Sequence, residues 1–393
     1  MNGHRLRQFR LARGMSLEEL AAALGGLVTR QALWKYEQGK AQPGAVVANK
    51  LAKVLGIKTI DLVAGPALTL EFIAYRKRAS LTKTEQERIE SFVTLALEDR
   101  VRLQQRLGII NGVLLKAKEC TIRSVVDAER VADTVRDKWN LGYDAISNVV
   151  AVLEDHYIHV IEIDADAKFD GISAVAKAPD GEIIAAVVVT NRGMPGERQR
   201  LSLAHELAHL LLKFGDDEID EEGSAYRFGG AFLLPAPTLR REVGDKRNSV
   251  SYTELLLLKK RFGMSMQAIL RRMKDVDIIS EAHYKQWCIE ISRLGYRKSE
   301  PDEMPAEQPQ WLTRSVSRAV SEGLMTVEEA KQMSIELETE TAAPLTLIQR
   351  RAFFKLPLAE RQKMLAAQAE KMVTHYETDP EWNELGSTEI VEY

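Results

Sequence analysis

Two histidines four residues apart, with a glutamate directly after the first, are the residues of this sequence whose types and spacing point most directly to chemistry. His205, Glu206 and His209 lie within LSLAHELAHLLLKF, residues 201–214, whose leucines recur at helical spacing. Residues i and i+4 share one side of a helix, about 5–6 Å apart at Cβ, so both imidazoles can reach one metal ion through bonds of ~2.0–2.1 Å. Glu206 is not placed to be a ligand, but its carboxylate can accept a proton from a metal-bound water.

This H-E-x-x-H spacing is typical of metal-dependent peptidases. The alternative interpretation is an amphipathic core helix that contains two histidines by chance. Histidine is scarce in this chain, at seven of 393 residues, so a chance match to the spacing is rare. The sequence therefore favours a metal site.

A catalytic zinc ion takes three protein ligands and leaves a fourth position for water. After His209 the chain passes through an acidic loop and enters a second helical run, DEEGSAYRFGGAFLLP, which ends at Pro235. Glu222 begins this run on the side of the small Ala225, and we expect it to be the third ligand, with Glu221 as the second choice. The alternative is an ordinary acidic first turn, which the helix dipole favours in any case.

Three strand-like runs, YIHVIEID, GISAVAKA and EIIAAVVVTN, precede the histidine helix and follow an apolar helix, ISNVVAVLEDH. A substrate peptide could add as a further strand along EIIAAVVVTN. His156 and His159 lie outside any ligand pattern, so we expect surface or internally satisfied histidines. Two short helices are expected within Ser249–Met273.

The first 66 residues predict a bundle of four or five short helices. Ser16 opens the second helix with a capping box, the glycines 25 and 26 end it, and Thr29 caps the third, TRQALWKYEQ, before Gly39. A tight glycine turn before the third helix is typical of a helix-turn-helix bundle. Residues 1–63 hold ten lysines and arginines against four acidic residues, a basic balance that suits nucleic acid.

The stretch VTRQALWKYEQGKAQP resembles XRE-type, lambda-repressor-like DNA-binding domains. The resemblance implies that the recognition helix faces the major groove of a double-stranded operator, where arginine and glutamine read base edges, and that a homodimer binds a two-fold site. The expected DNA-binding residues are Thr29, Arg30, Gln31 and Lys35. Leu33, Trp34 and Tyr36 are expected to hold the helix on its bundle. The alternative is a bundle used only for protein contacts, with Arg30 and Lys35 on a solvated face.

The metal region resembles the ImmA/IrrE family of metallo-endopeptidases. The resemblance rests on ERQRLSLAHELAHLLL and on E-x-x-A-x-R-F-x-G-A-F-L-L-P, with flanking WNLG, FDGISA, SYTELLLLKKRFGMSMQAILRRM and YKQWCIEISRLGYRKSEP. With the XRE-like head it spans roughly residues 4–334. It implies a small zincin fold in which His205, His209 and Glu222 hold zinc and Glu206 is the general base. Known members cleave helix-turn-helix repressors and so induce genes.

Tyr226, four residues after Glu222, departs from that family, whose members commonly carry a small polar residue or histidine there. A side chain at this position would support the metal ligands, so the departure bears on how the metal is tuned. A second group is also needed to polarise the substrate carbonyl. Arg227, Tyr252 and His283 are candidates by residue type alone.

The fold class expected from these patterns is α+β and mainly helical. The expected divisions are 1–66, the helix-turn-helix domain; 67–135, a connector with a strand (LTLEFIAYRK) and a long helix (84–107); 136–275, the zincin domain; 276–334, a helical extension that includes two short helices in 311–333; and 335–393, a linker and tail. We expect the connector to be a spacer or a contact between subunits. No apolar run is long enough to span a membrane, no apolar leader begins the chain, and Cys120 and Cys288 show no metal or disulfide spacing, so we expect a cytoplasmic protein.

The tail predicts one amphipathic helix followed by an acidic end, with three basic residues against eight acidic ones in 356–393. It faintly resembles the C-terminal arms of bacterial antitoxins, and an ordinary solvated tail is the alternative. The leading functional hypothesis is a DNA-binding regulator with a zinc endopeptidase domain that cleaves a repressor, a partner protein or itself in response to a signal. The alternative is a non-catalytic antitoxin and autorepressor with a structural or vestigial zinc site, whose tail binds a toxin partner.

Overall fold

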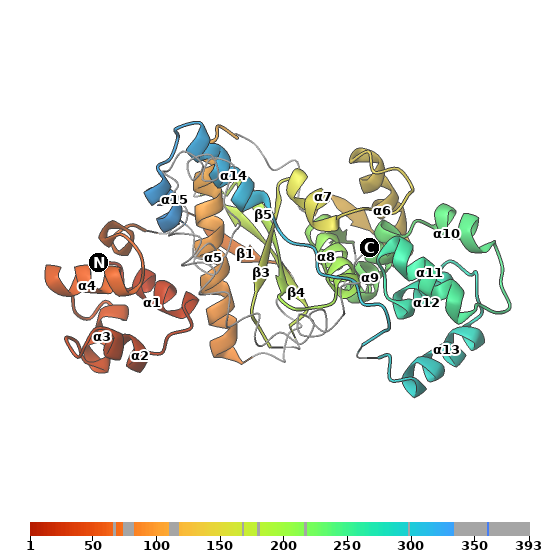
Figure 1. Cartoon of the computed structure of the whole chain (residues 1–393), viewed down its shortest axis with the longest axis horizontal. Coiled ribbons are helices and arrows are strands. Elements are labelled where there is room, and N and C mark those ends of the chain that lie inside the picture. The colour runs from red at the N-terminus through yellow and green to blue at the C-terminus, as the bar shows by residue number, and fades with distance from the viewer. Residues whose placement is uncertain are drawn as a thin grey trace, which may run out of the picture. The chain divides into compact units, whose positions relative to one another are not determined.

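The computed structural model describes residues 1–65, 68–73, 82–109, 118–166, 169–178, 181–215, 218–297, 299–333 and 360. The chain divides into two units, Met1–Glu336 and Leu337–Tyr393. Every element below belongs to the first unit and is drawn as a ribbon in Figure 1. Apart from Glu360, the predicted tail helix and acidic end lie outside the described residues. Among the described helices, none has the length and apolar character needed to cross a membrane. The expectation of an α+β, mainly helical fold is confirmed.

Five short helices form the N-terminal bundle. They are α1 (Gly3–Ala12), α2 (Leu17–Ala23), α3 (Arg30–Glu37), α4 (Ala45–Val54) and the 3-10 helix η1 (Thr59–Leu62). Ser16 and Glu19 form the predicted capping box, and Thr29 caps α3 by accepting from the backbone of Ala32. Gly25 and Gly26, between α2 and α3, both have positive φ, which glycine adopts without steric cost. Leucines from every element fill the core of the bundle.

A four-stranded mixed sheet, in the order β1-β4-β5-β3, forms the centre of the following region. Its strands are β1 (Thr69–Phe72), β3 (Ile158–Ile163), β4 (Gly171–Lys177) and β5 (Ile183–Asn191). β5 pairs with β4 in antiparallel fashion and with β3 in parallel fashion, while β1 pairs with β4. A separate parallel pair joins β2 (Cys120–Ile122) to β6 (Leu212–Phe214).

Both faces of the sheet are buried. Along β5, Val187 and Val189 contribute to one apolar cluster, whereas Ala186 and Val188, which point the other way, contribute to another. Helix α5 (Lys83–Arg106) covers the first face, and α7 (Val149–Asp155) and α8 (Gly196–Leu211) cover the second, as Figure 1 shows.

The interpretation of residues 67–135 as a spacer is wrong. β1 is an integral strand of the sheet, and α5 packs on that sheet through Ile89 and Val93. On its other side α5 supplies Leu95 to the core of the N-terminal bundle. Glu98 of α5 also accepts two hydrogen bonds from Arg5 of α1, at 3.0 and 2.7 Å, with both side chains almost fully buried. Residues 67–135 therefore contribute a strand and a covering helix to the sheet, and a core residue to the N-terminal bundle.

Further helices surround the histidine helix. They are α6 (Asp127–Lys138), α9 (Glu221–Leu233), α10 (Ala236–Val243), α11 (Tyr252–Phe262), α12 (Met266–Asp275), α13 (Glu281–Arg293), α14 (Trp311–Ser321) and α15 (Val327–Met333). The segment 299–310, between α13 and α14, crosses the N-terminal end of α8. Gly196 donates from its backbone to the Met304 carbonyl at 2.8 Å, and buried Lys259 pairs with Glu197 and Glu300. These contacts hold α8 in place.

Candidate metal centre

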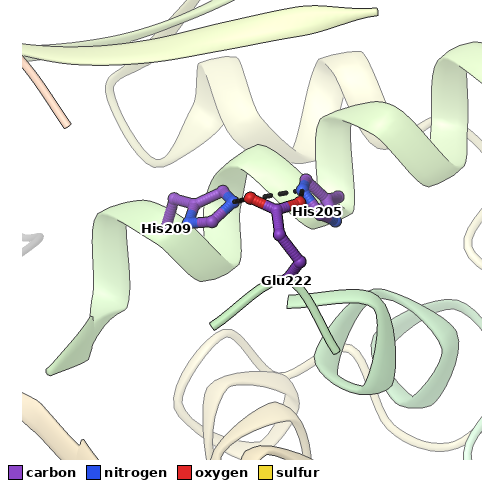
Figure 2. Close-up of side chains that lie close together, drawn as sticks. All are labelled: His205, His209 and Glu222. Atoms are coloured by element: carbon purple, nitrogen blue, oxygen red, sulfur yellow. Dashed lines mark hydrogen bonds and ion pairs between the residues drawn. The ribbon is translucent and has the colours of Figure 1, made fainter. Parts of the chain in front are cut away.

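Three side chains from two helices converge where the sequence predicts a metal site. His205 and His209 project from α8 and Glu222 from the first turn of α9, as Figure 2 shows. The two imidazole Nε2 atoms lie 3.1 Å apart, and the Glu222 carboxylate oxygens lie 3.3 Å from His205 Nε2 and 3.6 Å from His209 Nε2. Glu221, the second choice from the sequence, is not part of this cluster.

The donor set fits a zinc ion. Two ligand atoms that each lie ~2.0–2.1 Å from a tetrahedral ion are separated by about 3.4 Å, close to the distances among these three groups. Two imidazole nitrogens and one carboxylate also form a ligand set that catalytic zinc sites use, with one position left for water. His205 and His209 are buried and Glu222 is half-exposed, so the cluster opens to solvent on the carboxylate side.

Small residues allow the two helices to approach. Ala225 is fully buried in α9, and a Cβ on Gly229 would lie 3.4 Å from the backbone nitrogen of His205. The close approach brings the first turn of α9 to the face of α8 that carries the histidines. Phe228 and Phe232 are fully buried on α9, as expected for packing residues.

Glu206 is fixed by a contact that sequence reasoning missed. Its side chain is 2% exposed, and the hydroxyl of Ser173 on β4 donates to its Oε2 at 2.9 Å. A Cβ on Gly171, two residues earlier on the same face of β4, would lie only 3.2 Å from Glu206 Cγ. The alternation Gly-Ile-Ser marks residues 171 and 173 as neighbours on one face, but nothing in the sequence indicates that this face meets Glu206.

Tyr226 lies at the rim of the cluster. Its ring centroid is 4.4 Å from that of His205, and the residue is 56% exposed. Partial burial, together with the nearby carboxyl groups of Asp170 and Glu222, raises the pKa of the phenol. The hydroxyl therefore stays protonated at neutral pH and can donate a hydrogen bond.

The three residues considered for polarising the carbonyl are engaged with other partners. Arg227 donates to Glu129 at 2.7 Å and also bonds the Asp275 carbonyl, on the side of α9 that faces α6 and α12. Tyr252 packs with Tyr296, and His283 Nε2 accepts from the backbone of Val250 at 3.2 Å. Successive residues of a helix point about 100° apart, which explains why Arg227 does not share the direction of Tyr226.

The expectation of strand addition along EIIAAVVVTN is also wrong. β5 is paired on both sides from Ala186 to Thr190, with β4 and with β3. Its backbone groups are therefore already used in the sheet. His156 and His159 lie apart from the cluster, as expected. His156 Nδ1 lies 2.8 Å from the Val152 carbonyl. The expectation of a surface or satisfied histidine is wrong for His159, which is buried against Trp311 and whose Nε2 has no hydrogen-bond partner among the described residues.

The expected DNA-facing residues are all exposed on or beside α3. Arg30 forms an exposed ion pair with Glu18 at 2.6 Å, and Thr29, Gln31 and Lys35 are open to solvent. The expectation that Trp34 helps hold α3 on the bundle is wrong, because its side chain is 43% exposed, with Lys40 Nζ 4.4 Å from the ring centroid. Leu33, by contrast, is fully buried as expected.

Comparison with known proteins also separates a helix-turn-helix domain from a second domain that contains the metal cluster. A family model described as helix-turn-helix matches residues 6–62, and one described as an IrrE N-terminal-like domain matches residues 153–274. The chain therefore joins an XRE-type helix-turn-helix domain to an IrrE/ImmA-like, metallopeptidase-type domain, which confirms both resemblances.

A relative is the SPbeta prophage-derived uncharacterized HTH-type transcriptional regulator YonR of Bacillus subtilis (strain 168). The two sequences are 42% identical over 65 residues, which is 16% of this chain and 58% of the relative. The chain thus spans somewhat more than half of that relative's length, and the match concerns only a small part of its own.

Proposed function

We propose that the protein is a DNA-binding transcription regulator whose second domain is a zinc-dependent endopeptidase, which cleaves a repressor, a partner protein or itself in response to a signal. The observation that carries the proposal is the convergence of His205, His209 and Glu222 beside a buried, hydrogen-bonded Glu206. His205, His209 and Glu222 would hold the ion. The match to the IrrE N-terminal-like domain supports the same conclusion.

When bound, zinc supplies acidification of a water molecule and polarisation of the scissile carbonyl. Glu206 would accept a proton from the water that adds to the scissile carbonyl carbon and would return it to the amine nitrogen as the C–N bond breaks. Ser173 holds the Glu206 carboxylate in one orientation, and burial in the site excludes bulk water from it. We infer that the Tyr226 hydroxyl donates a hydrogen bond to the substrate carbonyl oxygen, because its ring lies 4.4 Å from that of His205 at the exposed side of the cluster.

The test of the peptidase is Glu206→Gln, compared with Glu221→Gln as the matched control on an acidic residue outside the cluster. The zinc-loaded proteins are incubated with proteins encoded by the neighbouring genes and with the unmodified chain itself, and products are identified by mass spectrometry. We expect Glu206→Gln to lose at least about 100-fold in cleavage rate while retaining zinc, because only proton transfer is removed. Glu221→Gln should cleave normally.

Undiminished cleavage by Glu206→Gln would contradict the assignment of the general base. An absence of cleavage by the wild-type protein against every candidate would instead favour the non-catalytic regulator as the function of the chain.

The DNA-binding part of the proposal rests on the exposed residues of α3. We expect a homodimer on a two-fold operator, with Arg30, Gln31 and Lys35 in the major groove. Lys35→Ala should weaken binding to DNA from upstream of the protein's own gene and, if Lys35 contacts a phosphate, lower the salt dependence by about one ion. Lys213→Ala, an exposed lysine of the second domain, is the control. Equal affinities and salt slopes for all three proteins in a fluorescence anisotropy titration would contradict this placement of α3.

A further inference from the structure

A groove runs from the candidate metal centre along the contact between α9 and α12. It encloses a cavity of about 420 Å³, and Glu222 and Tyr226 line it together with residues of α12 and α13. A substrate whose carbonyl lay beside Glu222 would therefore have this groove next to the bond to be cleaved. The volume is sufficient for one large amino-acid side chain.

The lining of the groove is apolar at several points. Leu201, Met264 and Ala268 contribute aliphatic surface, and Tyr226 and Tyr284 contribute aromatic surface. Leu201 lies one turn before His205 on α8, so this apolar surface begins close to the metal ligands. Burial of an apolar side chain against such surface is favourable in proportion to the area removed from water.

Three arginines also line the groove, but each already has a carboxylate partner. Arg227 and Arg272 both pair with Glu129, at 14% or less side-chain exposure for all three groups. Arg271 pairs with Asp275, 3.0 Å away. A charged substrate side chain would lose its hydration on entering and find these ion pairs already formed, apart from Arg272 Nη1, which is buried without a hydrogen-bond partner among the described residues. An aromatic ring, in contrast, can pack against the planar faces of paired guanidinium groups.

We propose that this groove is the specificity site for the side chain of a residue adjacent to the scissile bond, and that it takes an aromatic or large aliphatic side chain. The proposal rests on the proposed peptidase function. It goes beyond it by naming the substrate class, because the paired charges disfavour acidic and basic side chains while the apolar lining favours bulky neutral ones.

The experiment measures binding without turnover. Peptide hydroxamates bind a catalytic metal directly, and two series place the variable side chain on either side of the hydroxamate. Each series carries a benzyl, a methyl, a carboxymethyl or an aminobutyl side chain. Titration calorimetry on the zinc-loaded full chain should give the benzyl compound of one series an affinity about tenfold or more above that of the other three.

Two variants test whether the preference for the benzyl compound arises in this groove. Ala268→Phe fills the groove and should reduce the benzyl advantage to less than about twofold, while the methyl compound still binds. Leu257→Phe, on the exposed side of α11, is the matched control and should keep the full advantage. The comparison within the wild-type protein does not depend on either variant folding.

Equal affinities for benzyl and methyl compounds, or tighter binding of a charged side chain, would overturn the proposal. A benzyl preference that persists in Ala268→Phe would place the specificity site elsewhere. A benzyl preference in a protein that hydrolyses no peptide would leave the groove in place and overturn the proposed catalysis alone. Failure of every hydroxamate to bind would overturn both.

Discussion

The position of Glu206 depends on a residue that the sequence could not identify. Spacing alone predicts that His205 and His209 share a helix face, because four residues make about one turn. The position of Glu222, in the first turn of the next helical run and on the side of the small Ala225, predicts that its carboxylate can reach both histidines. Ser173 lies 33 residues before Glu206, and only the packing of β4 against α8 brings the two together. Local periodicity carries no information about that contact.

Removal of the Ser173 hydroxyl should separate positioning of the base from metal binding. We expect Ser173→Ala to lower kcat by about 10–100-fold with little change in KM and with zinc retained, because Glu206 loses the hydrogen bond that orients it. Ser173→Thr, which keeps the hydroxyl, should recover most of the rate. Ser249→Ala, an exposed serine, is the control. Steady-state kinetics with parallel metal analysis measures these effects, and an unchanged kcat in Ser173→Ala would contradict this role.

At the scale of elements, the sequence predicted most helices and strands but not the order of the strands. Capping residues and apolar spacing placed α2, α3 and α5 to within a few residues, since these signals are local. The run 201–214 predicted the middle of α8, but the helix begins at Gly196 and residues 212–214 form β6. The pairing of β1 with β4 joins segments about 100 residues apart and makes β4 an interior strand, while the parallel pairing of β3 with β5 makes β5 an interior strand. Strand order depends on such long-range pairings, so neither the role of the connector nor the site of strand addition could be predicted.

A buried histidine on β3, an edge strand of the sheet, should make the stability of the fold sensitive to pH. His159 of β3 is 1% exposed, its ring lies 4.6 Å from that of Trp311 on α14, and its Nε2 has no hydrogen-bond partner among the described residues. Burial, with a smaller contribution from the charge of Arg100, holds the pKa of His159 well below its ordinary value of 6.5. The folded protein therefore keeps this imidazole neutral where the unfolded chain protonates it.

Acid should consequently favour unfolding. Below about pH 6.5 the unfolded state binds one more proton at this position, so the free energy of unfolding should fall by up to about 1.4 kcal/mol per pH unit. His159→Gln is neutral at every pH and should remove the contribution of His159 to the slope of unfolding free energy against pH. His4→Gln, at an exposed position, should leave that slope unchanged. Urea unfolding between pH 5 and 7.5 measures the slopes. Identical slopes for wild type and His159→Gln would contradict this explanation.

At the scale of the whole molecule, α5 connects the two activities that we propose. Its residues complete the core of the helix-turn-helix bundle on one side and cover the sheet on the other, with the buried Arg5–Glu98 pair between α1 and α5. That sheet also contains β4, which holds Glu206 through Ser173. One helix thus joins the DNA-binding domain to the layer of structure that positions the general base.

The metal content of the purified chain tests the central claim most directly. Mass spectrometry of metals should find about one zinc per wild-type chain and per Glu206→Gln chain, and close to none in a variant that combines His205→Ala and His209→Ala. The chain also contains histidines outside the cluster, such as His283 of α13, and His283→Ala should keep its zinc. A wild-type protein without metal, or a double variant that binds as much zinc as the wild type, would contradict the account.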